Sequence, residues 1–225
     1  MNDAGLLANL VDLLPELAVA LGETLTMLGI GLAAAVLLGG PLGILLFLVG
    51  DGRLLPNRPL AAVLGWTVNT IRSFPFIILL VALVPFTRVI AGSSIGPVAA
   101  AVPLSVAAIP YFARLVEQTL REVPRGVIEA AQAMGASDLQ VVLRVLLVEA
   151  RPGLVLALTV LAISFLSYSA VAGVVGGGGI GDLAIRYGYY RFETDVMVFT
   201  VALLVLLVQA IQLAGNRLAR RLDKR

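Results

Sequence analysis

The sequence predicts an all-α polytopic membrane protein with five transmembrane helices, its N-terminus outside the membrane and its C-terminus inside. Three observations lead to this prediction: an apolar composition, long stretches without charge, and an uneven distribution of basic residues. Of the 225 residues, 60% are hydrophobic and 13% are charged, and the mean hydropathy is +1.01. Soluble domains are about 45–50% apolar and about 25% charged, so a bilayer is the better solvent for this chain.

Long uncharged stretches locate four of the spans. Runs of 27, 25, 30 and 21 uncharged residues follow Glu23, Arg88, Arg151 and Asp195, respectively. A helix needs about 20 apolar residues to cross the hydrocarbon core of a bilayer. Each run is therefore long enough to cross once.

A fifth span is less regular, because Arg72 divides it into uncharged runs of 13 and 15 residues. With this span included, we expect one transmembrane domain over residues 1–225. Its expected spans are approximately 24–50, 60–87, 93–114, 152–175 and 195–216.

The distribution of positive charge favours five crossings. With the N-terminus outside, 13 of the 16 Lys and Arg residues lie on the inner side and 3 on the outer side. If residues 60–87 did not cross, the split would be 10 against 6. Basic residues concentrate in cytoplasmic loops, so the five-span topology is preferred. Residues 1–23 contain no Lys or Arg, so we expect no cleavable signal peptide.

The composition also argues against several kinds of chemistry. The chain has no Cys and no His, which excludes disulfides and thiolate metal sites and removes the commonest general base. We therefore expect no catalytic residues and no metal site. The formal net charge of +2 gives no support to nucleic-acid binding.

A glycine-rich stretch, VVGGGGIGD (174–182), fits the dinucleotide-binding pattern G-x-G-x-x-G. That pattern indicates a nucleotide site only between a strand and a helix of a βαβ unit. Here it follows a hydrophobic run that is too long for a strand, on the side expected to be outside. We therefore expect these glycines to end a membrane helix and to allow tight turns.

The long inner loop over residues 117–151 predicts a helix–Gly–helix element. Glu117 and Arg121 have the spacing of a helical ion pair, so the third span should continue beyond the membrane until residues 124–126 break it. A short helix over about 127–134 should follow and end at Gly135, which suits a left-handed position after a helix.

The second helix of this element should begin at Ser137. Residues 137–140 have the S-x-x-Q form of a capping box. The first helix presents Glu129, Ala130, Ala131 and Ala133, whose small side chains let another protein approach the backbone closely. The carboxylate of Glu129 can pair with a base on that partner.

The stretch EAAQAMG, residues 129–135, resembles the E-A-A-x-x-x-G motif of the membrane subunits of ABC importers. The family pattern continues G-x9-I-x-L-P; in this chain Val145 stands at the Ile position, Leu147 matches and Val148 replaces Pro. The segments RSFPFIILL, PFTRVIAGSSIG and YSAVAGVVGGGGIGDLAIRYGY resemble the methionine-import permeases of that superfamily.

This resemblance implies a homodimer with two cytoplasmic ATPase subunits and an extracytoplasmic methionine-binding protein, often a lipoprotein. The loop over 117–151 would be the coupling loop. The ATPase-coupling residues would be Glu129, Ala130, Ala131, Ala133 and Gly135. No cofactor is expected in this chain, since ATP and Mg²⁺ would be bound by the ATPase; the chain has no G-x-x-x-x-G-K-[ST] sequence.

The implied activity is the import of methionine by alternating access in the cytoplasmic (inner) membrane of a bacterium, among membrane lipids. The L-isomer is the expected substrate, and transport of D-methionine or methionine derivatives is left open. The chain itself would not be an enzyme. The candidate residues of the translocation pathway are Arg72, Ser73, Pro75, Tyr168, Ser169 and Val171.

Several of these residues have a second interpretation. Arg72 either faces the pathway or extends to the inner headgroups. Tyr168 and Ser169 either line the pathway or hydrogen-bond a neighbouring helix. Gly39 and Gly43, four residues apart around a proline, favour close helix packing or a kink.

Two other classes of function fit the sequence less well. A secondary transporter or channel needs an ion or proton site within the membrane, yet Arg72 is the one charged residue that does not lie at the end of an expected span. A membrane enzyme would need paired carboxylates, a Ser/His arrangement or metal ligands.

Overall fold

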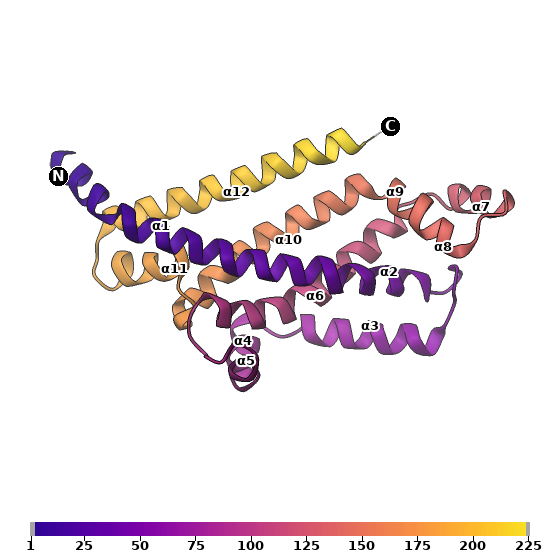
Figure 1. Ribbon diagram of the computed structural model, residues 1–225, viewed down its shortest axis with the longest axis horizontal. Coiled ribbons are helices and arrows are strands. Elements are labelled where there is room, and N and C mark those ends of the chain that lie inside the picture. Colours follow the sequence, from indigo (N-terminus) through magenta and orange to yellow (C-terminus); the bar gives the residue numbers. More distant parts are fainter. Residues whose placement is uncertain (1–2, 224–225) are drawn as a thin grey trace. The chain divides into compact units, whose positions relative to one another are not determined.

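The computed structural model describes residues 3–223, with side chains described from Leu13 onward (Figure 1). Within this range the chain is built from helices and short π-helical turns, with no strand. The elements are α1 (Asp3–Ala34), η1 (Ala35–Gly39), α2 (Gly40–Leu48), α3 (Arg58–Arg72), α4 (Phe76–Ala82), α5 (Val84–Ala91), α6 (Pro97–Arg121), α7 (Arg125–Ala133), α8 (Asp138–Gln140), η2 (Val141–Leu146), α9 (Leu147–Glu149), α10 (Arg151–Ala172), η3 (Gly173–Gly177), α11 (Gly179–Leu183), η4 (Ala184–Tyr189) and α12 (Thr194–Leu222). The all-α prediction is confirmed.

Four helical stretches are long and apolar enough to cross a membrane. They are Leu13–Leu48, Pro97–Arg121, Arg151–Gly177 and Thr194–Leu222. A fifth candidate consists of α3 and α4, which count as one span only if this bent pair is taken together. The chain therefore has four to five candidate spans.

The break between α3 and α4 has a local cause. Pro75 lies at the N-cap of α4, and a proline disfavours helical geometry at the residue before it. The Ser73 hydroxyl donates to the Asn69 carbonyl oxygen at 2.8 Å, which pairs one of the last carbonyls of α3. At its other end, α3 begins where the Asn57 side chain accepts from the Leu60 N–H at 3.1 Å.

The chain divides into two compact units, which we describe separately. Unit 1 comprises residues up to Leu32, Pro75–Val106 and Ala162–Ile211. Unit 2 comprises Ala33–Phe74, Ala107–Leu161 and residues from Gln212 onward. A buried cluster in unit 1 joins Leu17, Ala20, Ile180, Leu183 and Val196. A smaller cluster in unit 2 joins Leu46, Val68 and Ala113.

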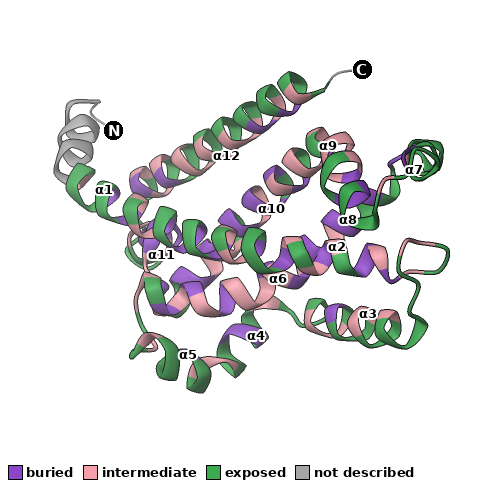
Figure 2. Cartoon of the chain, turned by 45° about the vertical axis from the view of Figure 1, so that its right-hand side comes forward, coloured by how far each residue is buried: buried purple, intermediate pink, exposed green. Residues whose placement is uncertain are grey.

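Exposed residues are frequent along the candidate spans (Figure 2), and many of them are apolar, including Leu37, Val81 and Leu206. Only 11% of the apolar window of α12 is buried. In water so much exposed apolar surface would be unfavourable, whereas acyl chains or another apolar protein surface can cover it.

Two glycines bring the first span close to α6 within unit 2. A Cβ atom on Gly39 would overlap the backbone of Ile109, and one on Gly43 would overlap the Ala113 carbonyl oxygen and the Val116 side chain. The expectation of close helix packing at this pair is confirmed. Small residues at helix contacts are typical of membrane bundles, where backbones approach each other directly.

A glycine turn follows α10 in unit 1. Gly176, Gly178 and Gly179 have φ values of +93°, +76° and +87°, which side-chain-bearing residues rarely adopt. Two side chains of α1 hold the start of α11. A Glu23 carboxylate oxygen accepts from the Gly179 N–H at 2.6 Å, and the Thr24 hydroxyl oxygen accepts from the Ile180 N–H at 3.0 Å. The prediction that these glycines end a membrane helix is confirmed.

Substituting Gly43→Ala and Gly65→Ala should change stability in opposite directions. At Gly43 the added methyl group overlaps α6, and overpacking costs about 1–3 kcal/mol. At Gly65, in α3, a Cβ atom meets nothing within 4 Å, so alanine should stabilise the helix by about 0.5–1 kcal/mol. Thermal unfolding of the purified variants in detergent measures both effects. Equal shifts for the two would contradict the close packing of Gly43.

Replacing Glu23 tests the hydrogen bond between its carboxylate and the Gly179 N–H. Glu23→Leu leaves the Gly179 N–H without its acceptor, which should cost about 1–3 kcal/mol of unfolding free energy. Glu23→Gln keeps an amide oxygen in the same place and should lose much less. The same unfolding assay in detergent compares the two variants. If Glu23→Leu and Glu23→Gln lose the same unfolding free energy, the hydrogen bond is not the source of the stability.

Candidate functional site

The helix–Gly–helix element of unit 2 is formed by α7 and the residues after it. Its first helix ends with a Schellman motif: the Gly135 N–H donates to the Gln132 carbonyl at 2.9 Å, and the Ala136 N–H donates to the Ala131 carbonyl at 3.1 Å. Gly135 has a φ of +84°, as the motif requires. The expected left-handed glycine after this helix is confirmed.

The second helix begins with the expected capping box. The Gln140 side chain accepts from the Ser137 N–H at 2.9 Å, and the Ser137 hydroxyl oxygen accepts from the Gln140 N–H at 3.4 Å. Two backbone donors at the start of α8 are therefore paired locally, and the direction of the chain after Gly135 is fixed.

The two faces of α7 differ in exposure. Ala131 is only 5% exposed and packs inside unit 2. Glu129, Ala130 and Ala133 are exposed, and Met134 is 82% exposed. The free face of α7 therefore carries one carboxylate, small side chains and a flexible thioether, which a protein surface can approach closely.

A buried carboxylate lies near the end of α6, the helix that precedes α7. Glu117 is 3% exposed and pairs with Arg114 and Arg121, each at 2.5 Å. Arg114 also donates to the Asn69 side-chain oxygen at 2.8 Å, which joins α6 to α3 inside unit 2. The predicted pair of Glu117 and Arg121 is confirmed.

The candidate pathway residues fall in both units. In unit 1, the Tyr168 ring stacks on Phe76 with centroids 4.8 Å apart and meets Phe165 edge-on at 5.1 Å. Pro75 directly precedes Phe76. Ser169 is 2% exposed, and its hydroxyl donates to the Leu166 carbonyl of the same helix at 2.7 Å. Val171, in α10, is half-buried.

The other two candidates lie in unit 2. Arg72 is exposed at the end of α3, and its guanidinium lies 5.6 Å from the centroid of the Tyr111 ring, a cation–π arrangement. Ser73 bonds the backbone of α3, as described above. The structure thus groups Tyr168 with Phe76 and Phe165, and groups Arg72 with Tyr111.

Charged and aromatic side chains also gather around η4 in unit 1. Asp182 and Arg186 pair at 2.7 Å, and the Arg191 guanidinium lies 4.4 Å from the Tyr187 ring centroid. A hydrogen bond to Glu16 raises the pKa of the Tyr187 phenol. The tyrosine side chains here suit an interface between water and hydrocarbon.

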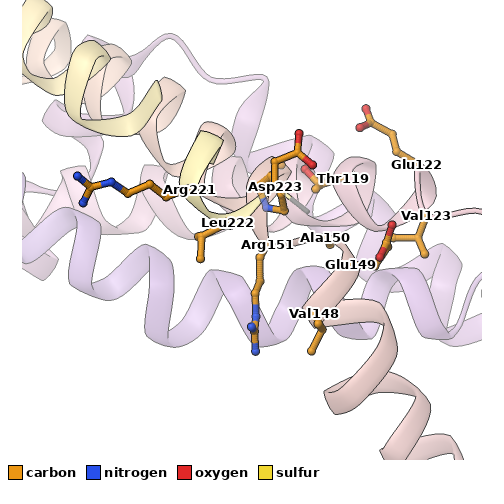
Figure 3. A pocket seen from close by; sticks show the side chains of 12 residues that line it. Thr119, Glu122, Val123, Val148, Glu149, Ala150, Arg151, Arg221, Leu222 and Asp223 are labelled. Carbon is orange, nitrogen blue, oxygen red and sulfur yellow. The ribbon is translucent and has the colours of Figure 1, made fainter. Parts of the chain in front are cut away.

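A cavity of about 300 Å³ lies in unit 2 among the end of α6, the start of α10 and the end of α12 (Figure 3). Its lining carries the acids Glu122, Glu149 and Asp223 and the bases Arg151 and Arg221. The mixture of signs favours neither an anion nor a cation. Among residues 13–223, no three side chains of the types His, Cys, Asp and Glu lie together as a metal site would require.

Sequence reasoning did not identify four residues that shape these sites. Glu23, Asn69, Phe76 and Tyr111 each act through partners far away in the chain. The partner of Glu23, Gly179, is 156 residues distant. A carboxylate at the edge of an apolar run was the one available signal for Glu23.

Known proteins give an independent comparison. Residues 28–225 match the family described as "Binding-protein-dependent transport system inner membrane component". The "Probable D-methionine transport system permease protein MetI" of Vibrio cholerae is 49% identical over 209 residues, which cover 93% of each chain. The "Methionine import system permease protein MetP" of Bacillus subtilis is 41% identical over 181 residues, covering 80% of this chain and 82% of that protein.

A solved structure of a methionine transporter is also similar to this chain in sequence and in fold. The structure titled "Inward facing conformations of the MetNI methionine ABC transporter" contains a chain that is 45% identical, with a TM-score of 0.92. The alignment covers 95% of this chain and 99% of that chain. The resemblance to methionine-import permeases is confirmed, and the chain belongs to the family of binding-protein-dependent transport system inner membrane components.

Proposed function

We propose that this chain is the permease subunit of an ATP-driven methionine importer. It would form the pathway by which L- and D-methionine, or methionine derivatives, cross the cytoplasmic membrane of a bacterium. The observation that carries the proposal is the exposed face of α7, with Glu129 and small side chains, in a chain whose relatives are methionine permeases.

In this proposal the chain crosses the membrane five times, with α3 and α4 together forming the second crossing. The N-terminus lies outside and the C-terminus inside. The distribution of basic residues supports this orientation. In it, α7 and the basic end of α12 lie on the cytoplasmic side, where Lys and Arg residues concentrate. The glycine turn after α10 then lies on the outer side.

Two copies of the chain assemble with two ATPase subunits, which bind ATP and Mg²⁺. The chain itself performs no covalent chemistry. Each ATPase receives one α7, where Glu129 pairs with a base and Ala130 and Ala133 allow close contact. An extracytoplasmic methionine-binding protein, often a lipoprotein, delivers the amino acid to the outer face.

The coupling works through the packing of unit 2. Three residues separate α6 from α7, and the buried Glu117 ties the end of α6 to Arg114 and, through it, to α3. A displacement of α7 by the ATPase is therefore passed to α6 and α3 rather than absorbed in a loose loop. Closure of the ATPases on ATP would open the dimer outward, and hydrolysis would reset it inward.

The aromatic group of unit 1 is proposed as part of the pathway. Tyr168, Phe76 and Phe165 present an apolar, polarisable surface, and thioether sulfur interacts favourably with aromatic rings. Such a surface suits the side chain of methionine and also blocks water and ions when the rings are stacked.

Reversing the charge of Glu129 tests the coupling. In proteoliposomes that contain this chain and its ATPase, Glu129→Lys should lower ATP-dependent uptake of labelled methionine by about tenfold or more, because it places like charges at the ATPase contact. ATP hydrolysis should be retained wherever the complex still assembles. Glu122→Lys makes the same charge change at an exposed site outside α7 and should stay within about twofold of the unmodified protein.

Either of two results would refute the importer proposal. One is methionine uptake without ATP by the unmodified complex. The other is equal uptake by the Glu129→Lys and Glu122→Lys variants. Competition by unlabelled L- and D-methionine in the same assay tests the stereoisomers.

Removing the Tyr168 ring tests the aromatic group. Tyr168→Ala deletes two ring contacts, each worth about 0.5–1.5 kcal/mol, so methionine efflux without ATP should rise by about fivefold or more. Tyr168→Phe keeps both contacts and should leave efflux low. Tyr190→Ala, at an exposed ring, is the control. The measurement is methionine efflux from preloaded vesicles. If efflux through the Tyr168→Ala variant stays as low as through the unmodified protein, the aromatic group is not part of the pathway.

A further inference from the structure

A group of arginines lies beside α7 in unit 2. Arg53, in the loop between α2 and α3, and Arg125, the first residue of α7, line a cavity of about 200 Å³. Phe47, Glu129 and Gln132 are also among its lining residues. The lining of the cavity thus includes two arginines and one glutamate.

Backbone hydrogen bonds and one cation–π contact fix the loop that carries Arg53. Its backbone closes through hydrogen bonds from the Arg53 N–H to the Gly50 carbonyl at 3.2 Å and from the Asn57 N–H to the Val49 carbonyl at 3.0 Å. The Arg53 guanidinium lies 4.4 Å from the centroid of the Phe47 ring, and this cation–π contact holds the side chain in place.

Two nearby carboxylates are paired with other arginines, while a third, Glu129, lines the cavity beside Arg53 and Arg125. Asp51 pairs with Arg58 at 2.9 Å, and Glu117 pairs with Arg114 and Arg121. Among the described side chains, no carboxylate forms an ion pair with Arg53 or Arg125. This region of unit 2 therefore has an excess of positive charge.

The ionisation of Arg53 reflects that excess. The pKa of its guanidinium is lowered, mainly by partial burial and further by the charges of Arg125 and Arg121. The charge of Glu117 raises this pKa, but by less. A negative ligand placed between Arg53 and Arg125 would relieve the repulsion that these charges exert on each other.

The position of the cavity at one end of a candidate span indicates the source of the ligand. Phe47 is the last residue but one of the candidate span Leu13–Leu48, so in the orientation proposed above the cavity lies at the cytoplasmic end of this span. Basic pockets between helices on the cytoplasmic side bind anionic lipid headgroups, and guanidinium groups match phosphate oxygens in a two-pronged geometry.

We propose that Arg53 and Arg125 form a binding site for a phosphate anion, supplied by the headgroup of an anionic phospholipid in the cytoplasmic leaflet. The lipid source rests on the membrane orientation proposed above. The bound phosphate joins the loop after α2 to the first turn of α7, and in this way steadies the helix that receives the ATPase.

Ligand titration of the complete chain in complex with its ATPase, in detergent, tests this site. The probes are a short-chain phosphatidylglycerol, a short-chain phosphatidylcholine and inorganic phosphate. The double substitution Arg53→Gln and Arg125→Gln should raise the Kd for phosphatidylglycerol by about thirtyfold, from roughly a fivefold loss per arginine near a headgroup. Phosphatidylcholine, which has no net charge, should bind at least about tenfold more weakly than phosphatidylglycerol to the unmodified protein.

A matched control removes two positive charges elsewhere on the same side. Arg58→Gln with Arg220→Gln should leave the Kd for phosphatidylglycerol within about twofold. Arg53→Lys with Arg125→Lys keeps the charge but loses the two-pronged geometry, and it should bind with an intermediate Kd. Thermal unfolding and gel filtration of each complex verify that the variants are folded and assembled.

The outcomes are distinct. Inorganic phosphate that binds as tightly as phosphatidylglycerol would keep the phosphate site and overturn its lipid source. Equal Kd values for the unmodified protein and the glutamine variant would overturn the site itself. Loss of ATPase association in the glutamine variant, with phosphatidylglycerol binding unchanged, would assign the two arginines to a protein contact instead. Since binding is measured without transport, failure of methionine uptake leaves this test valid.

Discussion

A hydrocarbon solvent offers no hydrogen bonds, and this constraint governs the rest of the structure. Every backbone N–H and C=O group inside the bilayer needs a partner within the protein, so an apolar chain must be helical there, and each interruption of a helix needs substitute partners. The interruptions in this chain have them: the Asn57 side chain at the start of α3, the Ser73 hydroxyl at its end, and Glu23 with Thr24 at the start of α11. At these places, polar residues within an otherwise apolar sequence pair the backbone groups that the interruption of the helix leaves free.

Local features of the sequence were enough to predict the helical class, the long spans and the helix–Gly–helix element. Charge-free runs, the spacing of Glu117 and Arg121, Gly135 and the Ser137 capping box each act within a few residues, so their geometry follows from the chain itself. Contacts between distant segments could not be predicted. Arg114 reaches Asn69 across 45 residues, and nothing near Asn69 indicates an arginine partner. The burial of Ala131 beside the exposed Ala130 likewise depends on which face of α7 meets the rest of unit 2.

The proposed functions fall in different units. Unit 2 contains α7, the buried Glu117 and the arginine pair Arg53 and Arg125, so partner recognition and its electrostatic support lie together. Unit 1 contains the aromatic group around Tyr168 and the glycine turn. The four long helical stretches contribute residues to both units.

The sparse burial of α12 has an evolutionary consequence. Side chains such as Val205 and Leu206 are 53% and 65% exposed, and an acyl chain distinguishes little between valine, leucine and isoleucine. Selection at such positions acts on apolarity and length of the helix rather than on side-chain identity. Where acyl chains cover this surface, we expect α12 to tolerate the exchange of one aliphatic residue for another. We expect much less tolerance at the glycines that touch α6 and at the residues that hold the glycine turn.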